Sequence, residues 1–187
     1  MGLALVQSRA LLGLQAPAVT VEVHLANGLP SFTLVGLADV EVKEARERVR
    51  AAIVNAGLEF PNNQRITVNL APADLKKAGP TYDLPIAVGV LIASRQIHTD
   101  VSDTLIVGEL SLDGLVRHTP GIISMISLAA QRGLRRAIVP AVDASEAALI
   151  EGIDIIGVHT LADVVNFLNG ELPLAPFQPT DSASEPP

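Results

Sequence analysis

The chain has 187 residues, 49% of them hydrophobic and only 3% aromatic, which predicts one domain with a core of aliphatic side chains. It contains no cysteine, so disulfide bonds, thiolate catalysis and thiolate metal ligands are excluded. The formal net charge of -7 disfavours a domain that binds nucleic acid over its whole surface, because such binding requires many cationic side chains at the phosphates.

The spacing of apolar residues divides the first third of the chain into strands and one helix. Scattered apolar residues predict a strand over 3–12, and strict alternation predicts a second strand over 19–25. The Asn27-Gly28 pair before residues 32–35 predicts that these residues form a hairpin with 19–25, since Asn-Gly readily adopts the positive φ of a tight turn. Helical spacing then predicts one helix over 39–56, which ends at Gly57.

Three cations on this predicted helix, Lys43, Arg46 and Arg50, lie beside its apolar stripe. Such a row is most often a solvated flank, and the i, i+4 pair of Glu44 and Arg48 fits that interpretation. The alternative is a basic face that contacts an anion or a partner. Lys43, Arg46 and Arg50 therefore form a candidate basic face.

The stretch RITVNLAPADLKKAGPTYDLPIAVGVLI, residues 65–92, combines a strand, a polar turn and a helix. Alternation predicts the strand over 66–70, and apolar residues at i, i+3, i+4, i+7 and i+8 from Leu84 predict the helix. Asp83 is expected to be the N-cap of this helix, because its carboxylate can accept a bond from an unpaired first-turn N–H. Pro85 then falls in the turn where a missing donor is harmless.

The polar turn before this helix is a candidate binding loop, formed by Lys76, Lys77, Gly79, Thr81 and Asp83. Lysine amines and the free N–H groups of a helix start can hold an anion together. Against this, the negative charge of Asp83 already occupies the helix start, so a capped structural turn is the preferred interpretation.

The second half of the chain alternates strands and helices. A strand is predicted over 104–112, and Asp113-Gly114 predicts a turn after it. Thr119 is expected to cap a helix with Pro120 in its first position, and Ile126 lies in its apolar stripe. Further elements are predicted over 136–140 (strand), 144–151 (helix), 153–158 (strand) and 161–168 (helix). This alternation predicts parallel strands joined by right-handed crossovers.

The sequence lacks the common motifs for metal and nucleotide binding. The four histidines show no HExxH or i, i+4 pairing, so no metal site is predicted. No GxxxxGK[ST] phosphate loop occurs, so the chain itself is not expected to hydrolyse ATP by that route. From Glu171 onward, proline, serine and acidic residues without periodicity predict a disordered linker over 171–187.

Three long segments, in order, resemble the N-terminal domain of the magnesium-chelatase-like ATPases of the ComM and YifB group. They are GLPSFTLVGLADVEVKEARERVRAAI, RITVNLAPADLKKAGPTYDLPIA and VGELSLDGLVRHTPGI. The resemblance covers nearly all of residues 1–170 and implies an α+β fold similar to the proteolytic domain of Lon, of the ribosomal-protein-domain-two-like kind. Such a fold has a mixed sheet, packed helices and βαβ units. Residues 171–187 would then lead toward an ATPase domain.

The similarity to Lon concerns the position of Thr81, which follows a Gly-Pro pair where Lon-type peptidases carry their serine nucleophile. Their lysine would fall at Ile123, and isoleucine cannot take a proton from the nucleophile. Arg117 and Arg132 flank the helix that contains Ile123, but arginine stays protonated and is a poor base. No catalytic residue is therefore assigned, and the chain by itself is not expected to be an enzyme.

The resemblance implies a non-catalytic accessory domain of a ring ATPase that remodels or branch-migrates DNA during transformation or recombination. Its expected partners are its own ATPase module and the neighbouring subunits of the ring, with DNA bound through the full-length protein. ATP and magnesium are expected only in the ATPase module. Two alternatives remain, a residual hydrolase that uses Thr81 and a module that contacts DNA directly. No apolar run reaches the roughly 18 residues of a membrane span, so a cytoplasmic protein is expected.

Overall fold

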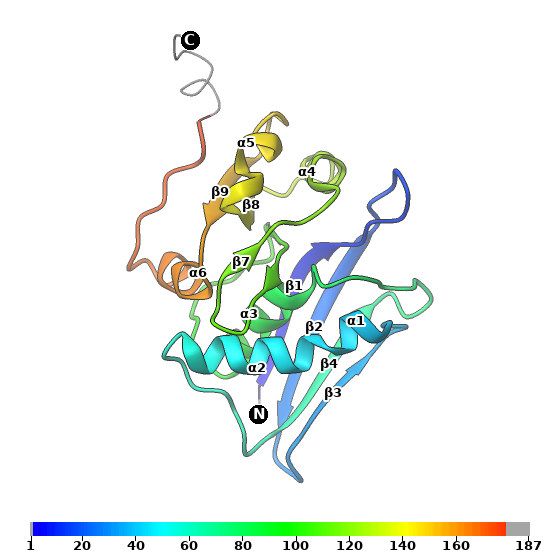
Figure 1. Cartoon of the computed structure of the whole chain (residues 1–187), viewed down its shortest axis with the longest axis vertical. Helices are drawn as coiled ribbons and strands as arrows, with labels where there is room; N and C mark the ends of the chain where they lie inside the picture. Colours follow the sequence, from blue (N-terminus) through cyan, green and yellow to red (C-terminus); the bar gives the residue numbers. More distant parts are fainter. Residues whose placement is uncertain (1, 179–187) are drawn as a thin grey trace.

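A mixed seven-stranded β-sheet runs through the molecule, with helices on both of its faces (Figure 1). The computed structural model describes residues 2–178. In spatial order the strands are β3 (Ser31–Val35), β4 (Arg65–Ala71), β2 (Ala18–Ala26), β1 (Gly2–Arg9), β5 (Thr104–Ile106), β8 (Arg136–Pro140) and β9 (Asp154–Val158). A separate ribbon consists of β6 (Glu109–Leu110) and β7 (Val116–Arg117). The helices are α1 (Val40–Lys43), α2 (Ala45–Asn55), α3 (Asp83–Ala93), α4 (Ile122–Gln131), the 3-10 turn η1 (Ala141–Asp143), α5 (Ala144–Ala147) and α6 (Leu161–Leu168).

The sheet joins an antiparallel half to a parallel half. Strand β2 pairs antiparallel with both β1 and β4, whereas β3–β4, β1–β5, β5–β8 and β8–β9 are parallel pairs. The predicted α+β class with a mixed sheet is therefore confirmed, as is the parallel pairing expected in the second half of the chain. The turn predicted at Asp113-Gly114 joins the antiparallel strands β6 and β7.

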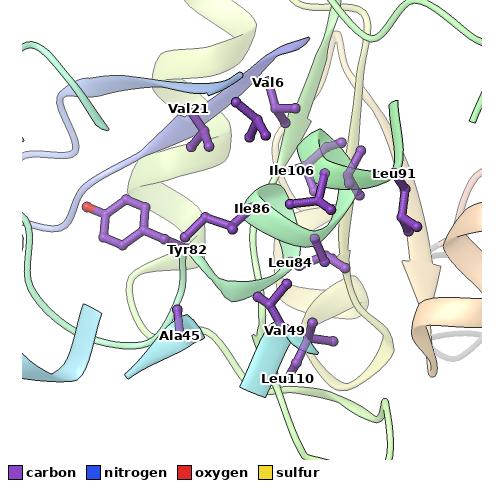
Figure 2. Close-up of a cluster of buried hydrophobic side chains, with 14 of the residues drawn as sticks. Val6, Val21, Ala45, Val49, Tyr82, Leu84, Ile86, Leu91, Ile106 and Leu110 are labelled. Carbon is purple, nitrogen blue, oxygen red and sulfur yellow. The ribbon is translucent and has the colours of Figure 1, made fainter. Parts of the chain in front are cut away.

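Helix α3 is the centre of the main core and packs on the antiparallel half of the sheet. Alternation in β2 and β4 turns one row of side chains toward it, and Val21, Val23 and Leu70 are fully buried. Figure 2 shows side chains of β1, β2, α2 and α3 meeting in this core. Gly89 permits the close approach of α3, because a Cβ there would lie 2.5 Å from Val23 Cγ2. The helix predicted from Leu84 is therefore present and almost wholly buried.

Strands β5 and β8 are buried on both faces because helices cover the sheet from both sides. Leu105 and Ala137 share a core with α4 and α5, whereas Ile106 and Ile138 belong to the core that contains α3 and α6. Continuous apolar runs are typical of such doubly covered parallel strands. Ile126 of α4 lies in the first of these cores and is fully buried, which confirms its predicted place in the helix stripe.

The predicted hairpin between residues 19–25 and 32–35 is wrong. Strand β4 lies between β2 and β3, pairing antiparallel with β2 over seven residues and parallel with β3 over five. The connection through Asn27-Gly28 is lengthened by Leu29-Pro30, and β3 therefore bonds to β4 instead of folding back on β2. The hairpin at this end of the chain is the β1–β2 pair.

Two helix starts differ from the sequence predictions. The helix predicted over 39–56 is divided at Glu44 into α1 and α2, and Asp39 caps α1 by accepting a 2.9 Å bond from Val42 N. The helix expected to begin at Thr119 and Pro120 begins instead at Ile122, after Gly121 with φ 74°. Thr119 N donates to the carboxylate of Asp143 at 2.8 Å, which holds this part of the chain outside the helix.

The strand predicted over 104–112 is interrupted at Gly108. Its backbone bonds to the start of α3, where Gly108 N donates to Thr81 O at 3.0 Å and Gly108 O accepts from Leu84 N at 2.9 Å. A Cβ at Gly108 would lie 2.9 Å from Val116 Cγ1, so glycine permits this close packing. The interruption therefore connects the loop that contains Thr81 to the end of β5.

Residues 171–178, the described part of the predicted linker, run beside strand β9. Phe177 N donates to Ile155 O at 2.8 Å, and the side chains of Leu174 and Phe177 pack on the two cores. Residues 179–187, the rest of the predicted linker, lie outside the described residues.

Candidate functional site

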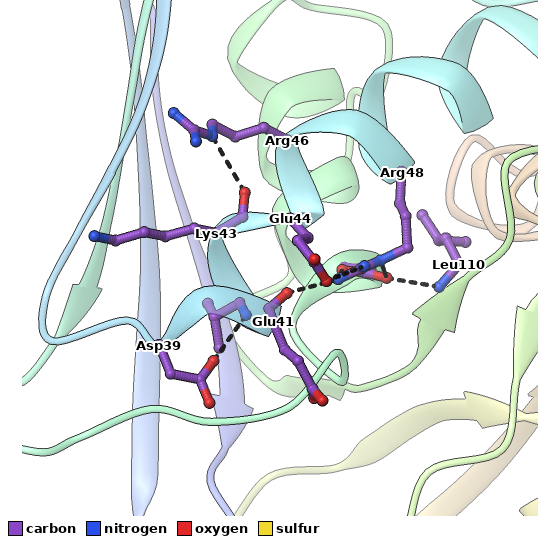
Figure 3. A network of polar contacts seen from close by, with 9 residues as sticks. Asp39, Glu41, Lys43, Glu44, Arg46, Arg48 and Leu110 are labelled. Carbon is purple, nitrogen blue, oxygen red and sulfur yellow. Dashed lines mark hydrogen bonds and ion pairs between the residues drawn. The ribbon is translucent and has the colours of Figure 1, made fainter.

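An ion pair joins the half-buried Arg48 of α2 to the fully buried Asp83 of α3, two residues after Thr81. Figure 3 shows Arg48 within a network of polar contacts near Glu44 and Leu110. Arg48 Nε donates to Asp83 Oδ2 at 2.6 Å, and Nη2 donates to Oδ1 at 3.1 Å. Leu110 N adds a third bond to Oδ2 at 3.0 Å. The Asp83 side chain is fully buried. Its carboxylate therefore receives charge-assisted bonds from a helix and a strand that are distant in sequence.

Arg48 also contacts the segment that precedes its own helix. Its Nη2 donates to Glu41 O of α1 at 2.8 Å, and Nη1 lies 3.6 Å from the Glu44 carboxylate. The predicted pair of Glu44 and Arg48 thus exists. The Glu44–Arg48 pair is the weaker contact, because Arg48 makes a bidentate interaction with Asp83 at shorter distances. One guanidinium thereby ties α1, α2, α3 and, through Asp83, β6 together.

The expectation that Asp83 caps α3 is wrong. Helix α3 begins at Asp83 itself, its N-cap residue is Tyr82, and no side chain makes a capping bond there. The reason is that the guanidinium of Arg48 and the N–H of Leu110 occupy the carboxylate oxygens of Asp83. The residue acts as an anchor between elements instead of a local cap.

Burial raises the pKa of Asp83 to about 6, although the bonds from Arg48 and from Leu110 N favour the charged form. Burial also opposes the charge of Arg48, but the hydrogen bond and the charge of Asp83 outweigh it and raise the pKa of that guanidinium. The environment is thus dry enough to oppose ionisation, while the pairing stabilises the ionised state.

The contribution of Asp83 to stability is expected to fall as pH rises from about 4 to about 6, in proportion to the ionisation of this residue. The pKa of Asp83 is higher in the folded state than its ordinary 3.8, so folding takes up a proton in this interval. This contribution is present below the unfolded pKa and is lost as pH rises through the folded pKa. Denaturant unfolding of the parent and of Asp83→Asn at several pH values isolates the effect. An identical pH dependence in both proteins would contradict it.

Thr81 is almost buried at 7% exposure, and its backbone is fixed by the bond to Gly108 N. Within residues 2–178, no histidine, lysine or carboxylate side chain forms a hydrogen bond with its hydroxyl. The next residue, Tyr82, is buried with an unpaired hydroxyl, and burial together with the charge of Asp39 raises its pKa. Ile123 lies on α4 and is 39% exposed. Among the described residues, no base is therefore hydrogen-bonded to the Thr81 hydroxyl, as activation of a nucleophile would require.

The two lysines of the candidate binding loop have different environments. Lys77 is fully buried, and its ammonium group donates to Gly36 O at 2.8 Å and to Pro72 O. Its backbone also pairs with the connection between β3 and α1, through Leu37 O and Asp39 N. Lys76 is exposed. The ammonium group of Lys77 thus binds carbonyl groups, and the carboxylate of Asp83 binds Arg48. Lys76, Lys77 and Asp83 do not form one charged cluster at the start of α3.

Gly79 is the remaining residue of the candidate binding loop, and its backbone has a positive φ. Its φ of 84° lies in the left-handed region that favours glycine, and a Cβ there would meet nothing within 4 Å. The position is therefore constrained by backbone conformation and not by packing.

The candidate basic face is exposed on α1 and α2, and its residues are partly tied to the sheet edge. Arg46 donates to Lys43 O at 3.2 Å and to Phe32 O at 3.4 Å. The Arg50 guanidinium lies 4.7 Å from the centre of the Phe60 ring. Figure 3 shows the ends of Lys43 and Arg46 directed away from Arg48. These cations therefore line one surface, and their binding to an anion or partner stays a prediction.

The sequence predicts the local pair of Arg48 with Glu44 and does not predict the ion pair of Arg48 with Asp83. The main partner of Arg48, Asp83, is 35 residues away in the sequence. Periodicity reports which face of a helix is apolar but not which distant carboxylate meets an arginine. One signal in the sequence is that Arg48 directly precedes Val49, a member of the apolar stripe. Arg48 therefore lies at the border of the buried face of the helix.

Two further properties concern ligands and membranes. Among residues 2–178, no three histidine, aspartate or glutamate side chains converge as a metal site would require. Over the same part of the chain, every helix is too short or too polar to cross a bilayer.

The fold and the anchored loop define an α+β domain with a mixed sheet, in which a Gly-Pro-Thr turn is held at the start of a buried helix. The model of the family described as subunit ChlI of Mg-chelatase matches residues 21–143, and the chain belongs to this family.

Curated relatives support this membership. The competence protein ComM of Haemophilus influenzae is 52% identical over 178 residues, which cover 94% of this chain and 35% of ComM. The uncharacterized protein YifB of Escherichia coli is 47% identical over 185 residues, 98% of this chain and 36% of YifB. Lon protease 2 of Bacillus subtilis is 29% identical over 164 residues, 79% of this chain and 29% of that protease. The chain spans about a third of the length of ComM and YifB.

Proposed function

We propose that this domain is a non-catalytic accessory domain of a magnesium-chelatase-like ring ATPase that remodels or branch-migrates DNA during transformation or recombination. The observation that carries the proposal is the immobilised Thr81 loop. The backbone of Thr81 accepts a hydrogen bond from Gly108 N, and the neighbouring Asp83 accepts hydrogen bonds from Arg48. The ammonium group of Lys77 donates to backbone carbonyls. A loop held in this way serves as a scaffold for surfaces that meet other modules.

Within residues 2–178, no amine, imidazole or carboxylate side chain forms a hydrogen bond with the Thr81 hydroxyl, which supports a non-catalytic role. A serine–lysine mechanism needs an amine within hydrogen-bond reach of the nucleophile. Position 123, where the family resemblance places that amine, is isoleucine, and the buried Lys77 bonds to carbonyls. The similarity to Lon protease 2 supports a Lon-protease-like fold, of the ribosomal-protein-domain-two-like kind, without its chemistry.

The proposed partners follow from the length of the relatives. ComM and YifB are about three times as long as the matched region, so we infer that an ATPase module accompanies this domain in the complete protein. ATP and magnesium bind that module in this proposal, and the domain contacts the module and the neighbouring subunits of the ring. The name of ComM as a competence protein supports a role with transforming DNA.

The isolated domain is expected to bind DNA only weakly, because 20 acidic residues outnumber 13 basic ones. Any binding through Lys43, Arg46 and Arg50, with Lys76 added, involves few phosphates. A salt slope of roughly -3 to -5 is expected for three to five such contacts, so the affinity should fade toward physiological salt. Titration with labelled duplex and single-stranded DNA at two ionic strengths measures this.

A charge-reversal control separates the accessory role from direct DNA contact, the second candidate function that the exposed basic face favours. Lys43, Arg46 and Arg50 are changed to glutamate in one variant, and the exposed Arg95, Arg117 and Arg135 are changed in a matched variant. The accessory role predicts weak, salt-sensitive binding in the parent and little difference between the variants. Submicromolar binding at physiological salt, lost only in the first variant, would assign direct DNA contact instead.

A further inference from the structure

A cavity of about 260 Å³ lies where the end of β1, the segment before β5 and the end of α4 meet. Gln7, Arg9, Ser102 and Arg132 are among the residues that line it. Its volume is below the roughly 300–1,000 Å³ of sites for drug-sized molecules, so it suits a small ion or one functional group.

Arg9 is the unusual residue of this cavity, because its guanidinium is charged and the side chain is only 5% exposed. It donates from Nη1 to Ala16 O at 2.7 Å and from Nη2 to Leu128 O, in the last turn of α4, at 3.3 Å. A guanidinium carries five N–H donors, and these two bonds leave three of them for other acceptors. Two carbonyls position the group, but they do not neutralise it.

The charge of Arg9 lacks an acidic partner in the described part of the chain. Within residues 2–178, no carboxylate lies within 4.0 Å of either Arg9 or Arg132. Burial, and then the positive charge of Arg132, lower the pKa of Arg9. Buried charges are normally paired, so the buried guanidinium of Arg9 is an exception in a protein of net charge -7. Arg132, the second cation of this cavity, is exposed.

We propose that this cavity binds a phosphate-type oxyanion between the guanidinium groups of Arg9 and Arg132. Guanidinium groups donate paired N–H bonds to phosphate oxygens, and an anion there relieves the repulsion between the two arginines. The Gln7 amide supplies a further donor at the wall. Ser102 donates its hydroxyl to Asp100 at 2.7 Å, so its proton is not assigned to the anion. The bound anion would join β1 to the end of α4.

The site does not depend on the accessory role proposed above. Its ligand is either free phosphate or one phosphate group of a nucleic-acid backbone, since both present the same oxygens. The small volume admits one phosphate group, with the rest of a larger molecule left outside the cavity.

The test measures inorganic phosphate binding to the 187-residue chain by calorimetry, with sodium chloride at matched ionic strength as the reference. Saturable binding is expected in the parent. Arg132→Gln is expected to weaken it by about tenfold or more, because a charge-assisted bond is lost. Arg117→Gln removes an exposed charge outside the cavity and should bind like the parent. Arg9→Lys keeps the charge but removes the paired donors and should also weaken binding.

The exposed position of Arg132 makes Arg132→Gln the decisive variant if the buried Arg9 proves necessary for folding. A short oligothymidylate competes with phosphate if a backbone phosphate can enter, and it leaves phosphate binding unchanged if only the free anion fits. Either result supports the site. Binding no stronger than the chloride reference, or equal binding in Arg132→Gln and Arg117→Gln, would overturn the proposal.

Discussion

Replacing Arg48 with alanine is expected to lower the free energy of unfolding by about 3 kcal/mol at pH 7, the lower end of the cost of breaking a buried ion pair, because Arg48 is half-buried. The change leaves the fully buried carboxylate of Asp83 with only the bond from Leu110 N. It also removes the bond to Glu41 O that ties α1 to α2. The loss should be smaller at pH 5 than at pH 8, because protonation of Asp83 removes the unpaired charge.

Urea unfolding of the variant and of matched controls measures this loss. Arg46→Ala removes an exposed arginine two residues earlier in the same helix and is expected to change stability by about 0.5 kcal/mol or less. A double variant, Arg48→Met with Asp83→Leu, removes both charges and should recover much of the loss, since apolar pairs can replace buried ion pairs. A loss below about 1 kcal/mol in Arg48→Ala would show that the pair does not anchor the loop.

Ile126→Ala is expected to cost about 2–5 kcal/mol, from lost burial and from the cavity left in the core between α4 and the sheet. Ile126 is fully buried there. Ile123→Ala, three residues earlier on the same helix, makes the same chemical change at a side chain that is 39% exposed. That control should lose much less stability.

Chemical denaturation of the two isoleucine variants under identical conditions compares them directly. Equal losses, or a larger loss for Ile123→Ala, would mean that α4 packs on the sheet through its other face. The comparison therefore tests the helix phase as well as the depth of burial.

Much of the fold follows from periodicity, because buried faces impose their spacing on the sequence. Alternation located the strand over 66–70 within β4, and helical spacing located 161–168, which is the extent of α6. The hairpin prediction is wrong because Asn27-Gly28 is only a local turn signal. Strand β4 pairs with β2 over seven residues and so occupies the position beside β2, and β3 pairs with β4. Strand order is a tertiary property that turn residues alone do not determine.

The candidate site was less predictable than the fold. The sequence predicts a candidate binding loop that contains Thr81 and Asp83, and local capping rules assign Asp83 to its own helix. In the structure, Asp83 accepts hydrogen bonds from Arg48, and Lys77 donates to the carbonyls of Gly36 and Pro72. Such long-range pairs depend on which elements become neighbours. Spacing within one element carries no information about them.

We propose that the domain supports a ring ATPase without chemistry at Thr81. The most direct measurement is ATP-dependent branch migration by a protein that carries this domain together with its ATPase module, as the parent, as Thr81→Ala and with residues 2–178 removed. We expect Thr81→Ala to migrate branches at a rate close to that of the parent, and the truncated protein to lose activity while it still hydrolyses ATP. Loss of branch migration in a well-folded Thr81→Ala protein, or peptidase activity that depends on Thr81, would contradict the claim.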